Sequence, residues 1–132
     1  MRIASVSEDQ KFEKRIAISP EIAKKYIDLG LEVSLSENYA EHLGFKDSKY
    51  KDLGVKISKD IKEVISNADV IVQLGLPSDE IIPLIKENQT LIGILNPYNN
   101  KEKLESLVKN KINVFSLELL PRITRAQSMD IL

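Results

Sequence analysis

The sequence predicts an α/β domain built around a mainly parallel, doubly wound sheet of five strands. Short apolar runs alternate with amphipathic stretches along its 132 residues, and the connections between them are short. The runs at 69–74 and 90–95 are rich in Val, Ile and Leu, which is typical of strands buried on both faces. Strands and helices that alternate in this way form a parallel sheet covered by helices on both sides.

The first helix is predicted by signals at both of its ends. Ser19 is the expected N-cap, Pro20 takes the first helical position, and Gly30 follows the last turn. Glu21 and Lys25 form an i,i+4 pair on its surface. Three apolar residues at helical spacing predict one apolar face: Ile22, Tyr26 and Leu29.

The other elements follow from the same kinds of pattern. Strands are expected at 2–6, 31–36, 69–74, 90–95 and 112–117. Further helices are expected after Ser58 as a cap, at 82–87, at 101–109 after Asn100 as a cap, and from Thr124 onward. The polar stretch at 37–55 is expected to be irregular, with one helical turn at 48–53. This succession of elements resembles that of flavodoxin-like domains.

The topology also indicates where a ligand would bind. In doubly wound sheets, ligands bind outside the carboxyl ends of the strands. The segments that follow these strand ends carry most of the candidate residues: 7–15, 73–78, 96–99 and 118–130.

Composition excludes several other classes of protein. The chain has 19 basic and 20 acidic side chains, well mixed, so no basic stripe is available for nucleic acid. One histidine and no cysteine leave little for a transition-metal site. The apolar runs are far shorter than the roughly 20 residues that cross a bilayer. No signal peptide is evident, so we expect an intracellular protein. The G-x-G-x-x-G motif of dinucleotide-binding domains is absent.

The densest cluster of polar side chains follows the last predicted strand. Arg122 and Arg125 are permanently charged donors, and Gln127 and Asp130 share a helical face that offers donors and acceptors. A carboxamide needs that combination. The alternative is that Thr124 caps the helix while the arginines pair with Asp130 or Glu118 on a solvated surface.

A family resemblance favours the first interpretation. Residues 118–132, ELLPRITRAQSMDIL, closely resemble the E-L-x-P-R-I-[ST]-R-A-Q-S-M-D segment of the proton-translocating NAD(P) transhydrogenase alpha subunit. Residues 13–20 are similar to the E-x-R-V-A-x-[ST]-P element that transhydrogenases share with alanine dehydrogenases. Residues 44–54 and 68–72 resemble two further segments of these proteins. The resemblance covers the chain from end to end.

The resemblance implies that residues 1–132 are the N-terminal domain of a longer subunit that lacks its Rossmann domain here. In the family, residues matching Arg122, Gln127 and Asp130 contact the nicotinamide of NAD(H), which the Rossmann domain binds. NADP(H) would bind to a partner domain or beta subunit, and the alpha subunit would be a homodimer. The complex couples hydride transfer to proton translocation, so this piece would be peripheral to the inner membrane on its cytoplasmic side, without insertion, and inactive alone.

Two positions depart from the alanine dehydrogenase branch, which is the alternative enzyme. That branch has a lysine and a histidine that hold and protonate a keto acid, and alignment places Gly75 and Asn96 there. Arg15, which grips a carboxylate in alanine dehydrogenases, is retained, and we expect it to pair with Glu8 or Glu13 instead.

A non-enzymatic signalling module is a further alternative. Glu8 and Asp9 follow the first strand, as an acidic pair does in phosphate-accepting receiver domains. A receiver would also have an aspartate at the end of the third strand, where this chain has Gln73. His42 lies in a polar loop and is expected to be solvated.

Overall fold

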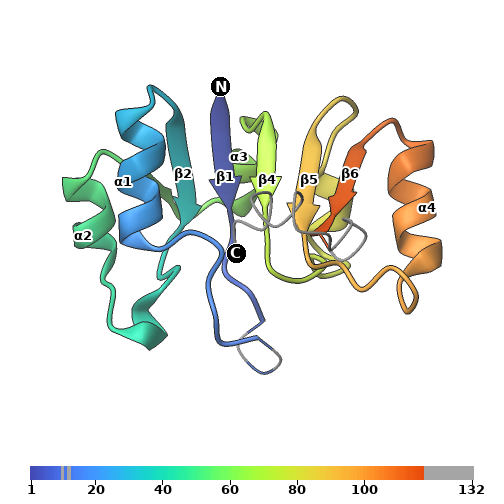
Figure 1. Ribbon diagram of the computed structural model, residues 1–132, viewed down its shortest axis with the longest axis horizontal. Helices are drawn as coiled ribbons and strands as arrows, with labels where there is room; N and C mark the ends of the chain where they lie inside the picture. Colours follow the sequence, from blue (N-terminus) through green and yellow to red (C-terminus); the bar gives the residue numbers. More distant parts are fainter. Residues whose placement is uncertain (10, 12, 118–132) are drawn as a thin grey trace, which may run out of the picture.

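One all-parallel sheet of six strands forms the centre of the computed structural model, which describes residues 1–9, 11 and 13–117. The strands lie in the order β3-β2-β1-β4-β5-β6, so β1 and β4 are central neighbours (Figure 1). Register places Ile3 beside Val33 on one side and Val70 on the other. The strands are β1 Arg2–Ser5, β2 Glu32–Ser36, β3 Lys56–Ser58, β4 Val70–Val72, β5 Thr90–Gly93 and β6 Asn113–Ser116.

The expected parallel, doubly wound sheet is confirmed, but the predicted number of strands was wrong. The additional strand is β3, three residues that pair with β2 at the edge of the sheet. Ser58 was expected to cap the next helix, whereas it is the Asp60 side chain that accepts the capping bond, from the Lys62 amide at 3.0 Å. With β3 included, the order is that of dinucleotide-binding sheets, and without it the order is flavodoxin-like.

Helices cover both faces of the sheet. Helix α1 packs on β2 and α2 on β3, while α3 contacts β1 and β2 and α4 contacts β6. Figure 1 shows α1 and α2 together beside β2, and α3 behind the centre of the sheet. The bounds are α1 Pro20–Asp28, η1 Glu41–Leu43, α2 Asp47–Asp52, α3 Ile61–Ser66, η2 Ile82–Leu84 and α4 Lys101–Lys109, where η1 and η2 are short 3₁₀ helices.

Helix α1 has the ends that its sequence predicts. The Ser19 hydroxyl accepts from the Ile22 amide at 3.3 Å, and Gly30 has a φ of 87°, which favours glycine. The prediction that Leu29 lies on the buried face was wrong, because α1 ends at Asp28 and the side chain of Leu29 is 76% exposed. Ala23 is the fully buried residue instead.

Two other local predictions were wrong for reasons of tertiary contact. The helix expected at 82–87 is only η2, because the Lys86 amide donates to the Gln89 side chain at 2.7 Å. Asn100 precedes α4 but makes no capping bond, because its side-chain amide donates to the carbonyls of Leu95 and Asn96.

Two apolar clusters form the core, one on each face of the sheet. The cluster beneath α3 and α4 contains Ala4, Val6, Val64, Ile65, Ala68, Ile71, Ile85, Leu91, Leu95, Leu107 and Ile112. The cluster beneath α1 and α2 contains Ile3, Ile18, Ala23, Val33, Leu35, Tyr39, Ala40, Tyr50 and Val55. Adjacent residues of β1 alternate between the two clusters, as the period of a strand requires. Within the described ranges, no helix is long and apolar enough to cross a membrane.

Candidate functional site at the switch point of the sheet

A cleft lies where the order of the strands reverses. The chain runs from β1 outward to β2 and β3, then returns to β4 and continues in the other direction, so β1 and β4 define the switch point. The cleft has a volume of about 760 Å³ and is lined by residues from 6–9 and 73–81, with Glu13, Asn100 and Lys103. Two segments predicted to carry the site, 7–15 and 73–78, therefore line one cleft.

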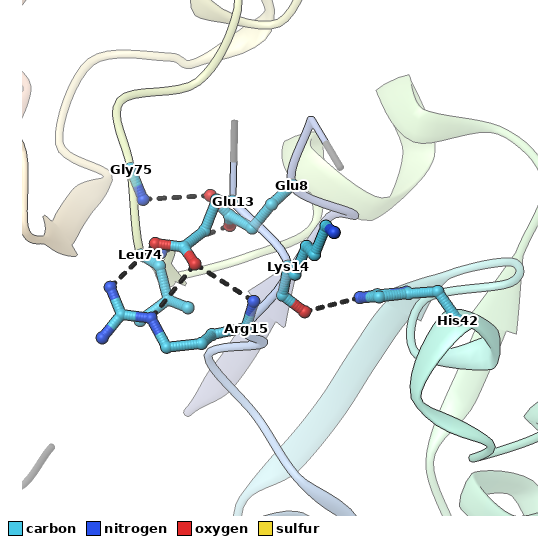
Figure 2. Close-up of polar contacts among 7 residues, drawn as sticks. All are labelled: Glu8, Glu13, Lys14, Arg15, His42, Leu74 and Gly75. Carbon is cyan, nitrogen blue, oxygen red and sulfur yellow. Dashed lines mark hydrogen bonds and ion pairs between the residues drawn. The ribbon is translucent and has the colours of Figure 1, made fainter. Parts of the chain in front are cut away.

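Glu8 joins the two central strands across this cleft. Its Oε1 accepts from the Gly75 amide at 2.9 Å, and its Oε2 accepts from the Leu74 amide at 3.2 Å (Figure 2). Oε2 also accepts from the side-chain amide of Gln73 at 2.5 Å. Burial raises the pKa of the Glu8 carboxyl, and the two backbone donors oppose that rise.

Gln73 is held from its other side by β1. Its Oε1 accepts from the Val6 amide at 2.8 Å and the Ser5 hydroxyl at 3.1 Å, and its Nε2 also donates to the Val6 carbonyl at 3.0 Å. The side chain is buried, and these contacts determine which end of the amide faces Glu8. Gln73 is therefore a fixed donor.

Tyr39 extends the same polar network to the beginning of α1. Its hydroxyl lies 2.8 Å from the Ser5 hydroxyl and accepts from the amides of Ala17 and Ile18, each at 3.1 Å. Burial raises the pKa of Tyr39 to about 12. Tyr50 donates to the Ile18 carbonyl at 2.9 Å. The loop between β1 and α1 is thus tied to the sheet at both of its ends.

Arg15 pairs with Glu13, one of the two partners expected. Its Nη2 lies 2.8 Å from Oε1 of Glu13, and its Nε donates to Oε2 at 3.1 Å (Figure 2). Hydrogen bonds from Arg15 lower the pKa of Glu13. His42 is exposed as predicted, but its Nε2 also lies 2.7 Å from the Lys14 carbonyl.

The charges of the described lining are mostly negative. Asp9, Asp79 and Glu80 line the cleft together with Glu8 and Glu13, and Lys103 lies 3.0 Å from Asp79. The part of the chain that the structure describes contains no group of three side chains able to hold a metal ion. Because Glu8 and Gln73 bind each other, the acidic pair of a receiver domain is not formed by Glu8 and Asp9 here.

The three residues predicted to contact a nicotinamide, Arg122, Gln127 and Asp130, lie outside the described residues, as does the helix expected from Thr124. Of the two positions that depart from alanine dehydrogenases, Gly75 lines the cleft and donates its amide to Glu8. Asn96 follows β5 with a φ of 49°. Sequence reasoning missed the role of Gln73; its one signal is a polar residue at the end of an apolar run.

These features define a doubly wound α/β domain with a polar cleft at its switch point. The chain belongs to the family described as "Alanine dehydrogenase/PNT, N-terminal domain", whose model matches residues 5–132.

Known relatives agree with this assignment. The chain is 38% identical, over its whole length, to an NAD(P) transhydrogenase alpha subunit of Rickettsia prowazekii and spans 36% of that protein. Alanine dehydrogenase 1 of Staphylococcus aureus is 28% identical over 96% of the chain, which spans 34% of that protein. The crystal structure of transhydrogenase from Sinorhizobium meliloti superposes with a TM-score of 0.89 at 31% identity, covering 98% of this chain and 39% of that one. The chain thus spans about a third of the curated relatives it matches.

Proposed function

We propose that the chain is the N-terminal domain of the NAD(H)-binding alpha subunit of an NAD(P) transhydrogenase. The intact enzyme would transfer hydride between NAD(H) and NADP(H) and couple this transfer to proton translocation. The observation that carries the proposal is the 38% identity to a transhydrogenase alpha subunit across the full length of this chain. The domain would take part in hydride transfer only as part of that enzyme.

Positioning of the nicotinamide would be the task of the segment after β6. Gln127 and Asp130 would hydrogen-bond the carboxamide of NAD(H), and Arg122 would orient the ring. Hydride passes directly between two nicotinamides, so the reaction needs geometry more than proton donors. NAD(H) itself would bind mainly to a Rossmann domain, and NADP(H) to a partner domain or beta subunit.

The uncovered half of one sheet face supports a place in a larger assembly. Register aligns Phe115 with Ile92 and Ile92 with Val72, which packs against the cluster beneath α1. Yet among the described residues no helix covers β5 and β6 on this face, and Phe115 is 57% exposed. A second alpha subunit and a beta subunit are the proposed partners, with the complex at the cytoplasmic side of the inner membrane.

The residue roles can be tested in a full-length alpha subunit assembled with its NADP(H)-binding partner. Arg122→Ala and Gln127→Asn should each slow hydride transfer by about tenfold or more, because a misplaced ring loses the reactive geometry. Their thermal unfolding should match that of the unchanged protein. Arg125→Ala is the matched control, since it removes the same charge from the same segment and no contact is assigned to it. Unchanged rates in the first two variants would refute the proposed roles.

An alanine dehydrogenase activity is the alternative, favoured by the retained Arg15 and the Staphylococcus aureus relative. Gly75 and Asn96 lack the groups needed to hold and protonate a keto acid. We therefore expect no pyruvate reduction by the full-length subunit with NADH and ammonia. Measurable alanine formation would instead favour the alternative.

A further inference from the structure

The donors around Glu8 form a complete receptor for one carboxylate. The amides of Leu74 and Gly75 and the side-chain amide of Gln73 all donate to it, and each carboxylate oxygen has at least one partner. Consecutive backbone N–H groups that converge in this way bind anions in many proteins. We call these three donors the carboxylate cradle.

Contacts other than those with Glu8 hold the cradle in place. The Gln73 amide donates to the Ile92 carbonyl at 2.9 Å, and the Ile94 amide donates to the Leu74 carbonyl at 2.9 Å, so β5 fixes the backbone that carries the donors. The Gln73 side chain is fixed by Val6 from β1. The cradle is therefore preorganised and should persist without its present occupant.

Glu8 reaches the cradle from a loop and not from the strands that build it. It follows β1 by three positions along the chain and is half-buried at the wall of the open cleft. Gly75 leaves the carboxylate accessible, because even an added Cβ there would lie 3.6 Å from Oε1. Burial raises the pKa of this carboxyl, so its charged form depends on the donors of the cradle.

We propose that the carboxylate cradle is a binding site for a carboxylate and that Glu8 is its tethered occupant, which excludes free carboxylic acids from the switch point. This occupancy restricts the chemistry of the cleft independently of the proposed role in hydride transfer. A small organic acid would have to displace Glu8, whose tether gives it a high effective concentration.

Emptying the cradle tests the proposal. In Glu8→Ala, formate should shift the amide resonances of Leu74 and Gly75 in a saturable way, with a dissociation constant in the millimolar range. In the unchanged protein the same formate titration should leave both resonances where they are. Glu13→Ala is the matched control, because it removes a carboxylate from the same cleft but leaves Glu8 in the cradle. Sodium chloride at equal ionic strength controls for screening.

Two outcomes would overturn the proposal: a folded Glu8→Ala variant in which formate shifts neither amide, or equal shifts in the unchanged protein. If Glu8→Ala does not fold, Glu8→Gln replaces it, since a carboxamide accepts through one oxygen only and leaves a donor open. Formate should then shift the amide that has lost its acceptor, and a failure to do so would equally refute the proposal. These readouts need no hydride transfer, so they are separate from the test of function.

Discussion

Two carboxylates five positions apart illustrate how local surroundings reverse the behaviour of one residue type. Glu8 and Glu13 leave the same loop and line the same cleft. Burial raises the pKa of Glu8, whereas Arg15 lowers that of Glu13. The sequence predicted that Arg15 would pair with one of them, but the choice depended on Leu74 and Gly75, more than sixty positions away.

The opposite shifts predict opposite dependences of stability on pH. A raised pKa means that the folded state binds the proton of Glu8 more tightly, so its stabilising effect is present below pH 4.5 and is lost as the pH rises through the folded pKa. For Glu13, the stabilisation is present above pH 4.5 and is lost as the pH falls. Urea unfolding between about pH 3.5 and pH 7 measures both effects.

Single substitutions separate the two contributions. Relative to Glu8→Gln, the unchanged protein should lose free energy of unfolding as the pH rises, because the variant has no proton to release at this site. Relative to Glu13→Gln, it should gain free energy of unfolding over the same range. Differences that change with pH in the same direction for both variants would show that the assigned causes are wrong.

At the scale of elements, the sequence predicted best where the signals were local. Helix α1 was found from Ser19, Pro20 and Gly30, whose capping roles depend on immediate neighbours. Strand β3 was missed because three residues carry too little pattern, and they become a strand only by pairing with β2. The helix expected at 82–87 was cut short by a side chain beyond its end, that of Gln89.

Gln89 should be more important for stability than its place beside a short helix suggests. Its buried side chain accepts from Lys86 and donates to the carbonyls of Ile65 and Ala68 at 2.6 Å and 2.7 Å, at the end of α3. Gln89→Leu should lower the free energy of unfolding by about 2–4 kcal/mol, because buried backbone groups would lose their partners.

Chemical denaturation monitored by circular dichroism can measure this loss. Glu87→Leu is the control, since it adds the same side chain at an exposed neighbouring position and should change stability by only about 0.5 kcal/mol. A Gln89→Leu variant as stable as that control would mean that the hydrogen bonds of Gln89 contribute nothing.

For the whole molecule, the alternation of strands and helices was enough to predict the parallel sheet and the end of it that carries the cleft. That inference needs only the handedness of the connections and the direction of the strands. The arrangement inside the cleft was not predictable, because Glu8, Gln73 and Tyr39 meet through contacts between segments that are remote in sequence. The roles assigned to Arg122, Gln127 and Asp130 stay predictions.

The two core clusters should unfold together. They lie on opposite faces of one sheet, but neighbouring residues of β1 belong to both, since Ile3 packs in one cluster and Ala4 in the other. Leu91→Ala in the first cluster and Leu35→Ala in the second should therefore each destabilise a single shared transition by about 2–5 kcal/mol. Far-ultraviolet circular dichroism reports the helices of both faces, and tyrosine fluorescence reports chiefly the cluster that contains Tyr39 and Tyr50. The two signals should give coincident denaturation curves in both variants; separate midpoints would show that each face folds as a unit of its own.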